Sequence, residues 1–253
     1  MNSGRPVSKD LARRVEVGEI VDRLGADDVG SAERGRLLAR LTAALLSRAR
    51  AAGGRAVLTG RALADAVAEL APAVPVRDLD ALRARHDGLT GDALAEALVG
   101  AACRTTAGIG AAGGALSAAQ LAAPPSLLVS PVQVAAETLA VVLVEIKLVA
   151  ELHVVHGSAA AGPPAQQAAE YLHAWVARSG VDDAGVAGVS AVLKTAARQQ
   201  LRGRLVRRFG RNLSTLAPFL AGAVAGAELN RRETRALGDA VREDLRRRLP
   251  GRP

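Results

Sequence analysis

The sequence predicts an all-α protein: a multi-helix bundle with close-packed, Gly/Ala-rich helical hairpins and no sheet. Apolar residues make up 49% of the 253 residues but aromatic residues only 2%, so the core has to be built from Ala, Leu and Val. Such side chains suit helices that approach closely, whereas a sandwich or barrel would need β-branched and aromatic residues in alternating patterns. Almost no such alternation is present. A chain of this length can bury a sizeable core.

The first hundred residues have the pattern of an amphipathic helical layer. Leu37, Leu38, Leu41 and Leu45 recur at helical spacing with arginines between them, which predicts a helix that ends at the pair Gly53-Gly54. The helices predicted in this part are 9–24, 31–52, 61–71, 77–86 and 92–106. We expect a division into an N-terminal helical layer at 1–88, a main helical domain at 89–249 and a short tail at 250–253.

The middle of the chain changes in character. Residues 105–136 contain no charged side chain, although 23% of the whole chain is charged. Pro131 stands where a long helix is expected to begin, and Gly157 where it should stop. The predicted elements from here on are a helix at 131–156, helices at 165–179 and 182–209, a second charge-free segment at 213–227 and a charged helix at 228–248.

We do not expect any apolar segment of the chain to cross a membrane. A spanning helix needs about 20 mostly apolar residues, and segment 213–227 is too short. Segment 126–148 is long enough but contains Glu137, Glu145 and Lys147, and a charge at mid-bilayer costs about 3 kcal/mol. No Trp or Tyr flanks the segments as an interfacial belt. Burial in a protein core or shallow interfacial insertion is therefore favoured.

Glycines recur in both charge-free segments. The run GIGAAG at 108–113 matches a dinucleotide-binding pattern, but that pattern works only when a strand precedes it, and here the preceding residues have a helical pattern. Small residues four apart instead favour close contact between helices, so we expect no nucleotide and no other cofactor. The glycines assigned to helix packing are Gly108, Gly110, Gly113, Gly222 and Gly226.

The predicted helix 131–156 has polar side chains on an otherwise apolar surface. At 100° per residue, Gln133, Glu137, Lys147 and Glu151 fall within about an 80° arc, with Glu145 to one side and His153 further round. Lys147 and Glu151 are four residues apart and can pair. The favoured interpretation is a solvated stripe on a core helix. The alternative is a polar groove that binds a partner or a small ligand.

Nothing in the sequence supports catalysis. It contains no phosphate-binding loop, no nucleophile elbow and no zinc-protease helix. His153, His156 and Glu151 could supply metal ligands one helical turn apart, but no further Cys or His nearby completes a set, so no metal is expected. An enzyme that uses Glu137, Glu145 or His153 is a weaker alternative, because these groups would have to converge on one cavity.

The charge of the chain is concentrated near its C-terminal end. From Lys194 onward there are 15 basic and 5 acidic residues, a net of +10, while the whole chain has +8. A basic surface suits polyanions, and basic residues on both sides of an apolar segment favour lipid over nucleic acid, which usually adds stacking aromatics. A merely solvated surface is the alternative. The predicted contacts with an anionic surface are Arg204, Arg207, Arg208, Arg211, Arg231, Arg232 and Arg235.

Three parts of the chain together resemble the EcsC family of bacterial proteins. They are Gly108-Ile-Gly110-Ala-Ala-Gly113, the stretch ETLAVVLVEIKLVAELHVVHG at 137–157 and the stretch FLAGAVAGAELNRRETR at 219–235. The resemblance covers about residues 90–248 and implies an α-helical domain associated with an ABC transporter involved in secretion, with no catalytic residues to carry over. The chain departs from the family at His156, where many relatives have an aromatic residue, and in its added N-terminal layer.

Two functions are therefore expected. The first is a non-enzymatic protein that associates peripherally with the inner face of the plasma membrane, or with a membrane-protein partner near a transport complex. The second is a wholly soluble helical scaffold or regulator that binds a protein partner. The lone Cys103 and the absence of an apolar signal segment at the start favour a cytoplasmic, reducing location.

Overall fold

A computed structural model describes residues 5–26, 29–51, 60–121, 129–178, 202–203 and 220–248. The predicted helix at 182–209 lies almost entirely outside these residues, as do Gly53-Gly54 and Arg204, Arg207, Arg208 and Arg211. All regular elements of the described residues are helical and none is a strand, which confirms the all-α prediction.

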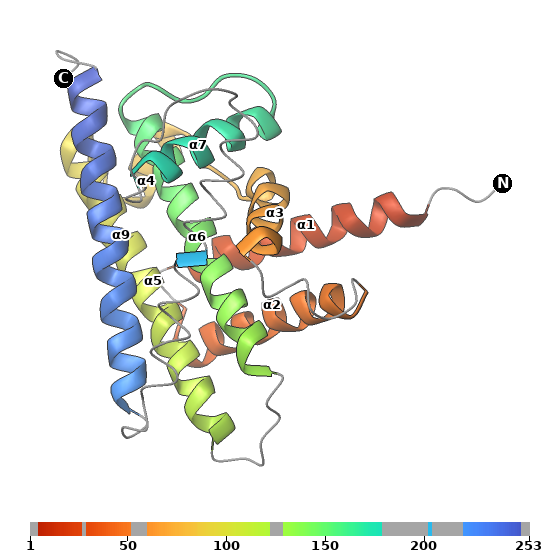
Figure 1. The fold of residues 1–253 in the computed structure, drawn as a ribbon. Helices are drawn as coiled ribbons and strands as arrows, with labels where there is room; N and C mark the ends of the chain where they lie inside the picture. Colours follow the sequence, from red (N-terminus) through yellow and green to blue (C-terminus); the bar gives the residue numbers. More distant parts are fainter. Residues whose placement is uncertain are drawn as a thin grey trace.

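Figure 1 shows the arrangement of the helices. In chain order they are α1 (Arg5–Leu24), α2 (Ser31–Ala51), α3 (Gly60–Leu70), the 3₁₀ turn η2 (Ala71–Ala73), α4 (Leu79–Arg85), α5 (Gly91–Leu121), α6 (Val129–Val155), α7 (Pro164–Arg178) and α9 (Leu220–Arg248).

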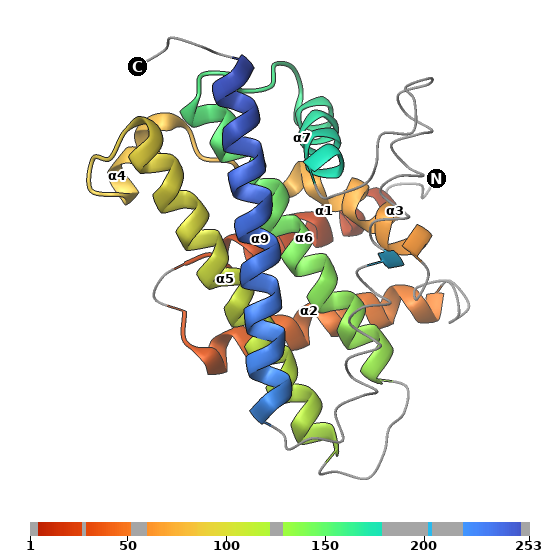
Figure 2. The ribbon, with the colours of Figure 1, turned by 60° about the vertical axis from the view of Figure 1, so that its left-hand side comes forward.

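Three long helices form the centre of the bundle. α5 packs against both α6 and α9, which also contact each other, and α5 runs antiparallel to both (Figures 1 and 2). α1 and α2 lie across these helices and extend to one side of the bundle. α7 packs on α6 and on α9 at the opposite end of the bundle from the C-terminal end of α5.

α6 is the most enclosed element. Residues 138–152 are all buried, and the helix contacts α1, α2, α3, α5, α7 and α9. A helix that is apolar nearly all round is expected in a core rather than at a surface. Its polar side chains are therefore not a solvated stripe, and this part of the sequence interpretation is wrong.

The helix ends follow local sequence rules. The side chain of Asp78 caps α4 by accepting a hydrogen bond from the backbone N–H of Ala81 at 2.8 Å. Gly157, with φ of +67°, ends α6 in a left-handed conformation. The N–H of Ser158 then donates to the carbonyl of His153 at 2.9 Å, which completes a glycine-based helix stop at the predicted residue.

Both charge-free segments are parts of long helices. α5 continues through the glycine-rich residues to Leu121 instead of ending near Thr106, and α9 begins at Leu220, before the charged residues start. Glycine weakens an isolated helix by about 1 kcal/mol per residue, but packing against neighbouring helices outweighs this preference. Here α6 and α9 supply that packing.

Candidate functional site

The polar residues of α6 occupy four separate environments rather than one groove. The structure brings Gln133 and Glu137 together near the start of the helix, and Lys147 and Glu151 together in its second half. Glu145 and His153 each lie apart from these pairs, against residues of other helices. Lys147 and Glu151 also pair with residues from other parts of the chain.

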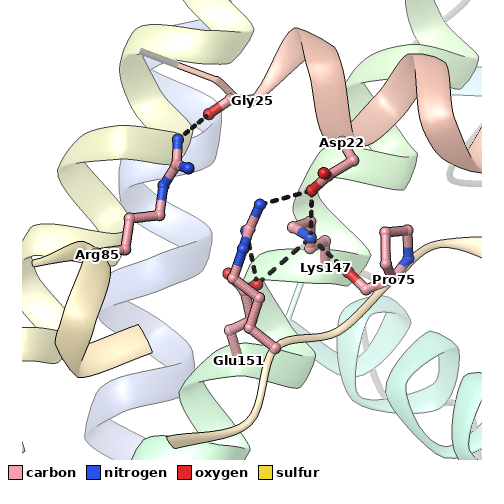
Figure 3. Close-up of polar contacts among 7 residues, drawn as sticks. Asp22, Gly25, Pro75, Arg85, Lys147 and Glu151 are labelled. Atoms are coloured by element: carbon pink, nitrogen blue, oxygen red, sulfur yellow. Dashed lines mark hydrogen bonds and ion pairs between the residues drawn. The ribbon is translucent and has the colours of Figure 1, made fainter. Parts of the chain in front are cut away.

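These two residues belong to an ionic cluster, which we define as Asp22, Arg77, Lys147 and Glu151 (Figure 3). Asp22 comes from the last turn of α1 and Arg77 from the segment between η2 and α4. The cluster therefore joins the N-terminal layer to the central helix.

Two cations and two carboxylates alternate around this cluster. Asp22 Oδ1 accepts from Arg77 Nη2 at 2.6 Å and from Lys147 Nζ at 3.1 Å. Glu151 Oε1 lies 3.2 Å from Arg77 Nη1 and 3.4 Å from Lys147 Nζ. Lys147 Nζ also donates to the carbonyl of Pro75. The Lys147 ammonium group thus has two hydrogen-bond acceptors and a further ion-pair partner.

The charged side chains of α6 in the ionic cluster are buried, so they need these ion pairs. The side chains of Lys147 and Glu151 are only 9% and 7% exposed, and a buried charge needs a partner of opposite sign. Burial acts to raise the pKa of Asp22, but the positive charges of Lys147 and Arg77 outweigh it, so the pKa lies below its ordinary value of 3.8. The carboxylate is therefore held in its charged form.

A small cavity lies on each side of Lys147. One, with a volume of about 190 Å³, is formed by residues of η2, α6 and α7 and includes Tyr171. The other, of about 50 Å³, lies among α4, α5 and α6 and includes Arg77 and Glu151. Glu137, Glu145 and His153 line neither cavity, so the convergence that an enzyme using them would need is not found at these two sites.

Glu145 lies at the centre of a buried polar network. Its carboxylate is fully buried and accepts hydrogen bonds from Trp175 Nε1 at 2.8 Å and from Thr234 Oγ1 at 3.2 Å. Thr234 in turn lies 2.9 Å from Thr106 Oγ1, and Asn230 donates to the carbonyl of Thr106. This network connects α5, α6, α7 and α9.

The other predicted residues of α6 contact the helices beside them. Gln133 donates to the carbonyl of Gly113 and to Glu137, both at 3.0 Å. His153 packs edge-on against Tyr171, with ring centroids 5.5 Å apart, and burial lowers its pKa below 6.5. These contacts hold α6 against α5 and α7.

The glycines of the charge-free segments lie at helix contacts. A Cβ on Gly110 would lie 2.6 Å from the carbonyl oxygen of Gly226, so the backbones of α5 and α9 touch there. A Cβ on Gly113 would lie 2.1 Å from the carboxylate of Glu137, and one on Gly108 would lie 2.9 Å from the side chain of Arg34. Gly222 lies in the first turn of α9, where the structure does not describe side-chain surroundings.

Three charge-free helix ends meet at one end of the bundle. They are 107–121 of α5, 129–136 of α6 and 220–227 of α9, and we call this end the charge-free pole. All three point to the lower end in Figures 1 and 2. Ile109 and Ala112 are buried within it, whereas Val224 is 68% exposed. The pole thus has an apolar surface as well as a packed interior.

The arginines of α9 fall into two groups. Arg235 and Arg242 pair with Glu96 of α5, and Arg246 pairs with Asp92, so these side chains attach α9 to α5. Arg231 and Arg232 instead pair only within α9, both with Glu228, and they are 51% and 73% exposed. Among the predicted anionic contacts in the described part of the chain, these two face solvent.

The described residues contain no group of three or more side chains placed to hold a metal ion. Comparison with models of known protein families, with curated proteins and with solved structures found no match. The resemblance to the EcsC family therefore stays a prediction.

Sequence reasoning missed Asp22 and Arg77. Both are ordinary surface-type residues in their local context, and they meet Lys147 and Glu151 across separations of 125 and 74 residues. The only local signal was the pairing of Lys147 with Glu151, which the structure has at 3.4 Å. Residues near Lys147 and Glu151 in the sequence give no sign that Asp22 and Arg77 complete the cluster.

Proposed function

We propose that this protein is a non-enzymatic helical protein that associates peripherally with an anionic membrane surface, at the inner face of the plasma membrane. The observation that carries the proposal is the charge-free pole, where three helix ends without any charged residue come together. Shallow insertion of such an end into the interfacial region buries apolar surface.

The surroundings of the pole support the same proposal. The side chain of Val224 is exposed there, and burying a valine contributes about 1.5–3 kcal/mol. Arg231 and Arg232 follow the pole by about one helical turn, and each basic residue near an anionic surface adds about 1 kcal/mol. Among the described residues, no helix combines the length and hydropathy needed to cross a bilayer.

The test is sedimentation with phosphatidylcholine vesicles, with and without phosphatidylglycerol, at low and high ionic strength. We expect the protein to pellet with the anionic vesicles at low salt and to be released at high salt, because the electrostatic attraction is screened. Recovery in the supernatant under all conditions would rule the proposal out.

A pair of valine substitutions locates the contact. Val224→Asp on the pole should weaken binding to the anionic vesicles by about tenfold or more, because it replaces apolar contact with a charge. Val15→Asp is the matched control, since Val15 is 49% exposed on α1, away from the pole. Equal binding of the two variants to the vesicles would show that the protein does not contact the membrane through the pole.

A second candidate is a helical scaffold or regulator that binds a protein partner. The contact between Gly110 and Gly226 favours it, because the small residues of both charge-free segments already have a protein neighbour. A link to a transport or secretion complex, as the EcsC resemblance implies, is compatible with either candidate. Membrane binding that requires a co-purified membrane protein instead of lipid alone would favour this second candidate.

A further inference from the structure

Glu228, Arg231 and Arg232 form a compact ionic group on the solvent-facing side of α9, which we call the arginine clamp. Arg231 Nε and Nη2 each donate to Glu228 at 2.8 Å, one to each carboxylate oxygen, and Arg232 Nε donates to Oε1 at 2.5 Å. Two guanidinium groups therefore converge on one small anion.

The helix fixes the direction in which the clamp points. Asn230 and Thr234 are 2% and 0% exposed and bind α5 and α6, so the other side of the same turns faces outward. The backbone carbonyl of Arg231 accepts a hydrogen bond from Cys103 of α5, which holds this turn in place. The clamp is thus an outward-facing site on a fixed helix.

Its height above the charge-free pole suits a lipid headgroup. With a rise of about 1.5 Å per residue, Arg231 lies about 16 Å along α9 from Leu220. If the pole inserts by about 5–10 Å, the clamp lies about 6–11 Å outside the inserted layer, among the headgroups.

The bound carboxylate occupies the place that an external anion would take. Arginine forms paired hydrogen bonds with carboxylates and phosphates alike, and a phosphate offers more acceptor oxygens. The two arginines lower the pKa of Glu228 to about 2, so the side chain stays charged at neutral pH and competes with any other anion. Glu228 therefore both orients the guanidinium groups and weakens their attraction for a second anion.

We propose that Arg231 and Arg232 bind the phosphate of an anionic lipid headgroup and that Glu228 is a built-in competitor that limits the strength of this binding. The inference rests on the proposed membrane association and adds to it a specific ligand and a residue that opposes binding.

The test compares three variants of the full chain on phosphatidylcholine vesicles that contain phosphatidylglycerol. Glu228→Gln removes one negative charge near the lipid, so binding should strengthen about fivefold. Arg231→Gln combined with Arg232→Gln should weaken binding on the order of twentyfold. All three residues lie at the surface, and circular dichroism of each variant verifies that the bundle is retained.

Glu243→Gln is the matched control. Glu243 also pairs with an arginine four residues on, at 3.4 Å from Arg247, and both side chains are exposed. It lies about 22 Å further along α9 from the pole, well beyond the screening length of about 8–10 Å. This variant should bind the vesicles as the unchanged protein does.

The outcomes separate the two proposals. If the unchanged protein binds and Glu228→Gln binds no better, the clamp is overturned while membrane association stands. If neither the unchanged protein nor Glu228→Gln binds the anionic vesicles, both the membrane association and the clamp are overturned. If inorganic phosphate binds the unchanged protein without vesicles and the combined Arg231→Gln and Arg232→Gln variant still binds vesicles as before, the ligand is free phosphate and the assignment to a lipid headgroup is overturned.

Discussion

The backbones of Gly110 and Gly226 lie directly against each other. This contact sets the distance between α5 and α9, because a Cβ on Gly110 would lie 2.6 Å from the carbonyl oxygen of Gly226. Side chains on either residue would push the two helices apart. The hydrogen bond between the short side chains of Thr106 and Thr234 also joins these two helices.

Gly110→Ala should therefore destabilise the protein by about 1–3 kcal/mol, the usual range for overpacking a close interface. Urea denaturation followed by circular dichroism measures the change. Gly35→Ala on α2 is the control, because nothing lies within 4 Å of a Cβ there, and it should stabilise the helix by about 0.5–1 kcal/mol. A neutral Gly110→Ala would mean that the two helices are not in backbone contact.

Lys147→Met should reduce the free energy of unfolding by about 3 kcal/mol. The substitution leaves Glu151 buried with one cation fewer. Removing one partner of a buried ion pair is more destabilising than replacing both partners with apolar residues. Adding Glu151→Leu should recover part of this loss, since the buried carboxylate that has lost its contact with Lys147 is then gone. A double-mutant cycle by urea denaturation measures the coupling, and strictly additive effects would show that the two residues do not interact.

Asp22 makes part of the stability depend on pH. Its pKa in the folded protein lies below the ordinary value of 3.8, so its contribution is fully present above that value and is lost as the pH falls through the lower folded pKa. Asp22→Asn should therefore be less stable than the unchanged protein at pH 7, and the difference should shrink in acid. Urea denaturation at a series of pH values measures this, and a difference that stays constant down to pH 2 would contradict it.

Trp175→Phe should destabilise the protein by about 1–3 kcal/mol, because Glu145 loses a hydrogen-bond donor in a fully buried position. Phenylalanine fills most of the space but cannot donate. Thermal unfolding followed by circular dichroism gives the comparison. Ala174→Ser, beside it on the same helix and only partly buried, should have a much smaller effect. An unchanged melting temperature for Trp175→Phe would show that this bond contributes nothing.

The elements that local chemistry determines could be predicted from the sequence. Gly157 stops α6 because it adopts a left-handed conformation, and the leucines of α2 are buried as their spacing indicates. The wrong interpretation concerned the polar residues of α6. Charges on a helix are usually solvated, and only the partners Asp22 and Arg77, distant in sequence, explain how Lys147 and Glu151 can be buried.

The continuity of α5 and α9 was missed for a similar reason. Runs of glycine and alanine have weak helical preference by themselves, and the sequence contains no local sign of what packs against them. The same holds for Glu145, which was placed correctly on the long helix but without Trp175 and Thr234 as partners. Fold class follows from composition and periodicity, whereas the arrangement of a site depends on contacts between distant residues.

The pairing of α5 with α9 also affects how the chain folds during its synthesis. The two helices meet across a separation of 128 residues at Thr106 and Thr234. On the ribosome, α5 and α6 emerge well before α9, and one side of α5 then has no final neighbour. Contacts between such distant segments form slowly, and exposed apolar surface favours aggregation in the meantime. Newly made chains therefore expose this side of α5 until α9 has been synthesised.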